Sequence, residues 1–373
     1  MRKVKTASIG LVLLLCGMYG CNTASAGWPL WQYFSDRFVQ ADGRVIDITF
    51  DQKSTSEGQA YGLFFALVAN QRQQFDTILK WTSDNLADGQ LGDKLPGWLW
   101  GRRNDGSWGI KDRNPASDAD LWIAYSLLEA ARIWNNPAYA ETAHKLLRNI
   151  QRDETVATAG TGALLLPGHY GFKLANGRFR IVTSYMPGFL FRYLAAADPQ
   201  GPWQAIWDNY VRMAPKIFSA GIAPDIFVVD ADGTVMPDTE APPSASYDAI
   251  RVYLWAGMSG ARGRELIRLL PGYARLIRET GVPPEKVNPQ NGIAVKSSYS
   301  PIGFAAAVLP YLAALDDKAA LAKQLERLAD VDNESPNYYD QSLILFGKGW
   351  MDGQYRFDDD GRLHTRWMQQ PAQ

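Results

Sequence analysis

The stretch ASDADLWIAYSLLEAARIW, residues 116–134, carries the pattern that decides the fold. Its large apolar residues recur at helical spacing, at positions 121, 122, 125, 128 and 134. A helix this apolar and aromatic cannot face water over much of its surface, so the pattern predicts a helix in the interior. Similar patterns begin at Tyr61, Ile250 and Phe304, and amphipathic helices are expected over 263–279 and 317–330.

The connections between these segments predict the fold class. They are long and contain Gly, Pro and Asn, and there is neither a regular alternation of strand and helix nor a repeat of fixed period. An all-α architecture with two layers of helices fits this organisation best. No linker or low-complexity run interrupts the chain, so we expect one domain over 27–373. Short strands are expected in the connections, around 162–166, 178–183 and 226–229.

Composition narrows the range of partners. The 373 residues include 38 basic and 39 acidic ones, giving a formal net charge of −1. Such a balance gives no strong field toward nucleic acid or an anionic membrane, so neither is expected as a partner. Aromatic residues are abundant, with 13 Trp, 17 Tyr and 15 Phe. Most must fill the core, but flat rings that line a groove would also pack on the apolar faces of sugars.

The first 26 residues are expected to be a signal peptide. A basic start is followed by an apolar stretch from Ile9 to Tyr19 and a small-residue cleavage site that ends at Ala26. The apolar stretch is too short to span a bilayer, and no later run is long enough, so no membrane span is expected. Both cysteines, Cys16 and Cys21, lie in this segment, so the mature chain would hold no disulfide or thiolate. A periplasmic or secreted protein is therefore predicted. A lipid anchor at Cys21 is the less favoured alternative, because Met18-Tyr19-Gly20 suits lipoprotein processing poorly.

Three of the predicted helices begin in a similar way. Each start combines Ser or Thr in a capping position with a carboxylate in the first turn, namely Glu57, Asp118 or Asp248. One such start is ordinary helix capping. Three together, each followed by a buried helix, suggest more: if these helices line a barrel, their first turns converge at one mouth.

Glycoside hydrolysis needs such a set of acids. One carboxylic acid gives a proton to the leaving oxygen, and a second carboxylate activates water or attacks the sugar. A helix N-terminus stabilises the charged carboxylate, whereas a proton donor must hold its proton. Burial or a neighbouring acid must therefore outweigh the helix dipole.

Several motifs resemble those of glycoside hydrolase family 8. The run 116–134 resembles the family signature over all 19 positions, and Ser56 to Gly62 and Ser246 to Val252 resemble two further hallmarks. The segments Pro301 to Phe304 and Tyr338 to Leu343 are also similar to family segments. The likeness covers about residues 28–350, and it is strongest toward the periplasmic endoglucanases that accompany bacterial cellulose synthase.

This resemblance implies a fold and a reaction. The fold would be an (α/α)6 barrel, all-α with short strands in its connections. The reaction would be hydrolysis of internal β-1,4 bonds of cellulose with inversion and without a cofactor or metal. Glu57 matches the proton donor, Asp248 the base that activates water, and Asp118 the signature aspartate that holds the distorted sugar. Inversion predicts donor and base carboxyls about 6.5–9.5 Å apart. A role in cellulose production, with the cellulose synthase machinery as partner, is also implied.

Other residues are predicted to bind substrate. Arg251 follows Asp248 by one helical turn, so it can pair with it and keep the base ionised. Tyr247 is expected to hydrogen-bond near the base. Asp120 should point away from Asp118 and serve a capping or structural role. At least one of three tryptophans in a Gly-rich region is expected to stack on glucose: Trp98, Trp100 or Trp108.

Competing functions are weaker or stay open. Only His144, His169 and His364 are present, without a paired spacing for a metal hydrolase, and no serine-hydrolase or P-loop motif is complete. A barrel that binds glycans without cleaving them is an alternative from another class. A relative acting on chitosan, xylan or mixed-linkage glucan is the alternative enzyme. The protein is expected to be a monomer.

Overall fold

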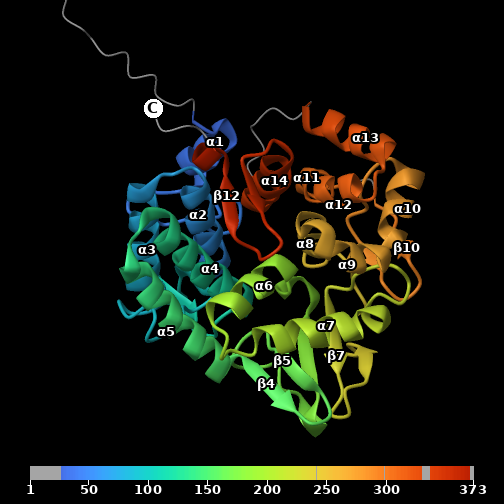
Figure 1. Cartoon of the computed structure of the whole chain (residues 1–373), viewed down its shortest axis with the longest axis horizontal. Helices are drawn as coiled ribbons and strands as arrows, with labels where there is room; N and C mark the ends of the chain where they lie inside the picture. Colours follow the sequence, from blue (N-terminus) through green and yellow to red (C-terminus); the bar gives the residue numbers. More distant parts are fainter. Residues whose placement is uncertain (1–26, 241, 298, 330–336, 370–373) are drawn as a thin grey trace, which may run out of the picture.

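Inner and outer helices alternate along the chain. The computed structural model describes residues 27–240, 242–297, 299–329 and 337–369. The inner helices are buried on nearly all sides, and Figure 1 shows them enclosed by the outer ones. The inner positions are α2 (Ser56–Val68), α4 (Ser117–Trp134), α6 (Gly188–Ala197), α8 (Ile250–Met258), α11 (Ile302–Ala307) with α12 (Leu309–Ala314), and α14 (Tyr338–Met351).

The outer helices each bury one face against this inner ring. They are α1 (Pro29–Phe38), α3 (Arg72–Leu86), α5 (Pro137–Asp153), α7 (Trp203–Ile217), α9 (Arg264–Arg268) with α10 (Pro271–Thr280), and α13 (Lys318–Ala329). Short 3-10 helices are η1 (Ala175–Gly177), η2 (Thr183–Tyr185), η3 (Gly260–Gly263) and η4 (Arg366–Gln369). The expected all-α (α/α)6 barrel is confirmed.

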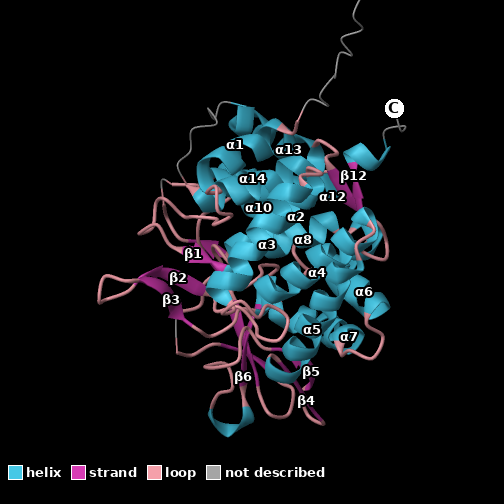
Figure 2. Ribbon diagram, turned by 90° about the vertical axis from the view of Figure 1, so that its left-hand side faces the viewer, coloured by secondary structure: helices cyan, strands magenta, loops and turns pink. Residues whose placement is uncertain are grey.

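Short strands occupy the connections that lead from an outer helix to the next inner one. Two antiparallel sheets have the orders β1 (Ser54–Thr55), β2 (Leu99–Arg102), β3 (Trp108–Asp112) and β6 (Phe179–Val182), β7 (Ile226–Val229), β8 (Val235–Pro237). Two hairpins are β4 (Thr155–Thr158) with β5 (Gly162–Leu165) and β9 (Val287–Asn288) with β10 (Ile293–Ala294). These strands therefore precede inner helices, and Figure 2 shows several of them outside the helical body. The last hairpin, β11 (Tyr355–Phe357) with β12 (Leu363–Thr365), instead follows α14.

Two predicted helices are divided by proline. The segment 263–279 was expected to be one helix, but α9 ends at Arg268 and α10 begins at Pro271. Pro310 likewise lies at the start of α12, just after α11 ends. A proline lacks the N–H that would continue the helix and disfavours helical geometry in the preceding residue. The three predicted strands are confirmed as β5, β6 and β7.

Most aromatic residues fill the barrel. Phe346 on α14 lies at the centre of the cluster, with ring centroids 4.9 Å from Tyr61, 5.0 Å from Trp255 and 5.4 Å from Trp122. Edge-on packing of this kind adds to the free energy of burial. The aromatic excess is therefore mainly a property of the core, and few rings are left for a ligand.

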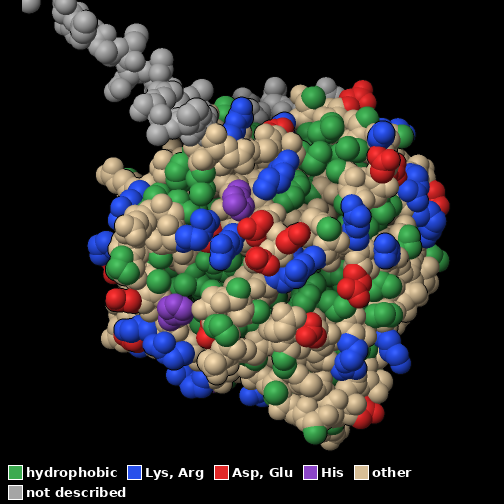
Figure 3. Space-filling view, in the orientation of Figure 1, with side chains coloured by type: hydrophobic (Ala, Val, Ile, Leu, Met, Phe, Trp, Pro, Cys, Tyr) green, Lys and Arg blue, Asp and Glu red, His purple; other side chains and the backbone are tan. Residues whose placement is uncertain are grey.

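The surface carries charges of both signs. Figure 3 shows basic and acidic side chains interspersed on the face it displays. Within the described ranges, no helix is both long and apolar enough to cross a membrane. The predicted signal peptide, including Cys16 and Cys21, lies outside the described residues.

Candidate active site

A single arginine joins the three predicted acids. Arg251 lies on α8, and its side chain is only 5% exposed. Its Nη1 donates to Glu57, to Asp118 at 3.3 Å and to the Tyr61 hydroxyl at 3.1 Å. Its Nη2 donates to Asp248 at 2.6 Å. Three acids from distant parts of the sequence thus converge on one guanidinium, and the predicted pairing of Arg251 with Asp248 is confirmed.

The start of α2 positions Glu57. As expected, a hydroxyl caps this helix, since Thr55 Oγ1 accepts a hydrogen bond from the Gly58 amide at 3.0 Å. Glu57 and Tyr61 are four residues apart, so both reach Arg251 from one face of the helix. Gln59 lies on another face and ties the helix to its surroundings, accepting from the Val45 amide at 2.6 Å.

Asp118 lies in the first turn of α4 without the predicted serine cap. The residue at the cap position is Ala116, and within the described residues the Ser117 hydroxyl has no hydrogen-bond partner. Asp118 instead accepts from the Ala119 amide at 2.8 Å. Burial raises the pKa of Asp118 to about 7; Arg251 opposes this shift and Glu57 adds to it. Asp118 can therefore hold a proton near neutral pH.

The third acid differs from the prediction in its local setting. Asp248 precedes α8, which begins at Ile250, so it lies outside the first turn. The Ser246 hydroxyl does not cap the helix but donates to the Glu285 carbonyl at 2.8 Å. Asp225 holds this segment, since its Oδ1 accepts the amides of Ser246 and Ala249, each at 2.8 Å. No sequence pattern links Asp225 to residues 246–249, so the prediction missed it.

The three acids differ in access to solvent. The side chains of Asp248, Glu57 and Asp118 are 42%, 23% and 7% exposed. Desolvation raises the pKa of Asp248, Arg251 lowers it, and Asp225 raises it further, with a net upward shift. The expectation that Arg251 alone would keep this acid fully ionised is therefore too simple. Asp248 is nevertheless the acid that water reaches most easily.

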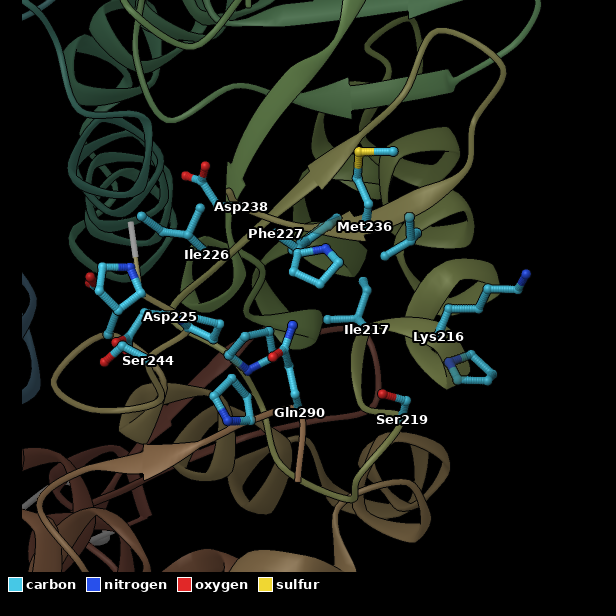
Figure 4. Close-up of a pocket in the computed structure, with 18 residues that line it drawn as sticks. Lys216, Ile217, Ser219, Asp225, Ile226, Phe227, Met236, Asp238, Ser244 and Gln290 are labelled. Carbon is cyan, nitrogen blue, oxygen red and sulfur yellow. The ribbon is translucent and has the colours of Figure 1, made fainter. Parts of the chain in front are cut away.

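Two cavities border the acids. One of about 570 Å³ is lined mainly by apolar side chains, with Asp225 and Asp248 among its residues. In Figure 4, Asp225 and Ser244 lie at one end of this cavity and Lys216 at the other. A smaller cavity of about 190 Å³ includes Glu57 and Tyr339 in its lining. Glu57 and Asp248 thus each face open space.

Of the three candidate tryptophans, Trp108 offers the most free surface. It is 44% exposed and stacks on Trp100, with ring centroids 5.3 Å apart. The Arg44 guanidinium lies 4.2 Å from the centroid of Trp100 and 5.0 Å from that of Trp108. Trp98 is half-buried, and its carbonyl accepts from the Ser56 amide at 3.0 Å, directly before Glu57. Trp98 therefore helps to place the start of α2.

Two tyrosines change the predicted site. The Tyr247 hydroxyl donates to the Glu285 carboxylate at 2.9 Å, and its ring is 42% exposed. Tyr185 was not predicted, yet its ring centroid lies 5.9 Å from the Arg251 guanidinium. Burial, Asp118 and Asp248 all raise the pKa of Tyr185, so its hydroxyl keeps its proton. Its position at the end of η2 gives no recognisable sequence signal.

Metal ligands are not gathered at this site. In the described part of the chain, no group of three or more His, Cys, Asp and Glu side chains has an arrangement that could hold a metal ion. The positive charge beside the acids comes from Arg251. The chemistry that these residues can perform is proton transfer between carboxyl groups and a bound substrate.

Comparisons with known proteins place the chain in a family. The family model of the glycosyl hydrolases family 8 matches residues 3–353. An endoglucanase of Xanthomonas axonopodis pv. citri is 44% identical over 91% of this chain and 89% of its own length. An endoglucanase of Escherichia coli K12 is 39% identical over 97% of this chain and 98% of its own length. The crystal structure of an endo-1,4-D-glucanase from Vibrio fischeri is similar with a TM-score of 0.85 and 39% identity, over 91% of this chain and 99% of that one. The chain belongs to glycosyl hydrolase family 8.

Proposed function

We propose that this protein is an endo-1,4-β-glucanase that cuts internal bonds of cellulose with inversion. The observation that carries the proposal is the convergence of Glu57, Asp118 and Asp248 on the side chain of Arg251. The endoglucanases to which the chain is similar support β-1,4-glucan as the substrate.

In the proposed mechanism, Glu57 and Asp248 act from opposite sides of the scissile bond. Glu57 donates its proton to the glycosidic oxygen as the bond to the anomeric carbon breaks. Asp248 takes a proton from a water molecule whose oxygen attacks that carbon from the other face, so the new hydroxyl is in the α configuration.

The proposed reaction needs space for this water molecule between the two acids. The two acids contact the two Nη atoms of one guanidinium. The bond to Asp248 is 2.6 Å long and the bond to Glu57 is no longer, so with a guanidinium width of roughly 2.3 Å the facing oxygens can be at most about 7 Å apart. An inverting enzyme needs carboxyls about 6.5–9.5 Å apart.

Asp118 and Arg251 are proposed to hold the other participants. Arg251 maintains the spacing of the acids in the free protein. When substrate binds, Glu57 must be neutral to act as a donor, so Arg251 is then held by Asp118 and Asp248. The least exposed acid, Asp118, is placed to hold hydroxyls of the distorted sugar at the cleavage point.

The substrate groove is proposed to use exposed rings. Trp108 offers a face on which a glucose ring can stack, and Tyr247 offers a second ring near Asp248. Trp98 and Trp100 would support these contacts from below rather than bind sugar directly.

We also propose export and a role in cellulose production. Residues 1–26 would direct export and be removed after Ala26, leaving a monomeric catalytic domain of residues 27–373. In the periplasm or outside the cell, the enzyme would trim glucan beside the cellulose synthase machinery. N-terminal sequencing of the exported protein tests the cleavage site, and loss of cellulose output on deletion of the gene tests the role.

A proton NMR time course on a short cello-oligosaccharide tests the reaction itself. The first product signal is expected from the α anomer, and chitosan and xylan should be cleaved far more slowly. An initial β signal would contradict inversion. Binding without any cleavage, in wild-type protein whose Tm shows it to be folded, would favour the non-catalytic alternative.

A further inference from the structure

A separate pair of buried acids lies close to Asp118. Asp120 on α4 and Glu154 directly after α5 are both 0% exposed. Their side chains are within hydrogen-bonding reach of one another. Within the described residues, no N–H or O–H group donates a hydrogen bond to any of the four carboxyl oxygens. This differs from the acids above, which Arg251 neutralises.

Such a pair is stable only if it holds a proton. Two buried carboxylates in contact would repel each other, and among the described residues no cation forms an ion pair with either of them. A proton shared between them removes one charge and supplies the missing donor. The carboxyl pairs of aspartic proteases share a proton for the same reason.

The helix ends decide which acid holds the proton. Asp120 lies in the first turn of α4, where the helix dipole favours a negative charge. Glu154 is the C-cap residue of α5, where the dipole disfavours one. The charge therefore belongs on Asp120 and the proton on Glu154.

We propose that Glu154 is a neutral acid that donates a hydrogen bond to the Asp120 carboxylate and thereby positions the first turn of α4, which carries Asp118. The other charged groups that face the pair are Asp118 from α4 and Asp153 from α5. Asp153 pairs with Arg152, and His169 Nδ1 lies 3.8 Å from its carboxylate. Burial raises the pKa of both Asp120 and Glu154, and Asp118 raises each further.

The variant Glu154→Gln tests the pair directly. Its amide donates the same hydrogen bond but cannot lose the proton at high pH. In the wild type, Glu154 stabilises the fold below its unfolded pKa, about 4.3, and this contribution is lost as pH rises toward the higher pKa of the folded protein. Over that window, the unfolding constant of the wild type should rise with pH more steeply than that of the variant, because only the wild type retains this proton when folded. The difference in slope is up to about tenfold per pH unit.

Glu129→Gln is the matched control. Glu129 is also 0% exposed and on α4, but it accepts hydrogen bonds from Arg132 and from the Leu363 amide. Its substitution should destabilise the protein without flattening the pH dependence of unfolding between pH 5 and 9. Parallel stability curves for wild type and Glu154→Gln would overturn the proposal. If Glu154→Gln does not fold, Asp120→Asn provides the same comparison; because the amides satisfy the hydrogen bond, failure of both to fold would also contradict it.

Activity measurements test the effect on Asp118, and this second experiment rests on the proposed function. Loss of the shared proton at high pH places a second negative charge on Glu154, which interacts electrostatically with Asp118. Relative kcat/KM for Glu154→Gln is expected within about twofold of wild type at pH 6 and at least about threefold above it at pH 9. An unchanged ratio would show that the pair does not influence Asp118, while the stability curves would still report on the shared proton.

Discussion

Removing Arg251 should destabilise the protein more at high pH than at low pH. Arg251→Met keeps a long side chain but leaves three carboxylates without their common cation. Breaking a buried ion pair by deleting one partner costs about 3–5 kcal/mol. Only part of this free-energy cost applies to Asp248, because its side chain is 42% exposed to solvent. We therefore expect a loss of about 3 kcal/mol at pH 8, or a fall in Tm of roughly 4 °C.

The pH dependence separates this electrostatic effect from a loss of packing. Arg251 lowers the pKa of Asp118 and of Asp248, so in the variant both acids bind protons at higher pH than in the wild type. A folded-state pKa raised in this way reduces stability as pH increases. The loss should therefore be smaller at pH 5, where Asp118 is neutral in the variant.

Thermal unfolding followed by circular dichroism between pH 5 and 8 measures both quantities. Arg275→Met is the control, because Arg275 is 50% exposed and forms an ion pair with Glu279 on the surface of α10. That substitution should cost less than about 1 kcal/mol at either pH. A loss for Arg251→Met that is equal at pH 5 and pH 8 would refute the electrostatic reasoning.

Three further substitutions test single residues of the site. Glu57→Gln removes the transferable proton and should reduce kcat by about 10²–10⁴-fold with Tm nearly unchanged; unaltered kcat on cello-oligosaccharides would exclude Glu57 as the donor. Asp225→Asn removes a charge that raises the pKa of Asp248, so the acid limb of the kcat/KM profile should move to lower pH, and a shift to higher pH would contradict this role. Trp108→Ala should raise KM about 2–10-fold in steady-state assays while kcat is retained, and unaltered KM would remove Trp108 from the groove.

Local patterns predicted the parts of the site that depend on local structure. Helical spacing and apolar content identified the inner helices, and the acids at their starts followed from capping chemistry. The pairing of Arg251 with Asp248 spans three residues, so helix geometry alone supplies it. A hydroxyl caps α2 as expected, whereas no side chain caps α4 or α8. Asp118 instead accepts the amide of its neighbour in α4, and Asp225 holds the segment before α8.

Contacts across the barrel could not be predicted in the same way. Arg251 reaches Glu57 over 194 sequence positions and Asp118 over 133. Asp225 holds the segment that carries Asp248 from a connection between α7 and β7, where nothing in the sequence distinguishes it from other acids in turns. Such contacts depend on how the ring of helices closes. The family resemblance predicted a closed barrel, whereas the spacing of residues could not.

The two acid clusters also show why counting acids in a motif is an unreliable guide to a site. Asp118 and Asp120 are two residues apart, and both head the same buried helix. Asp118 faces Arg251 and the mouth of the barrel, so a cation stabilises it where substrate can arrive. Asp120 faces the end of α5, where only a proton from Glu154 can stabilise it. The direction of each side chain around α4, rather than its distance along the sequence, therefore determines which acid is available for catalysis and which one supports it.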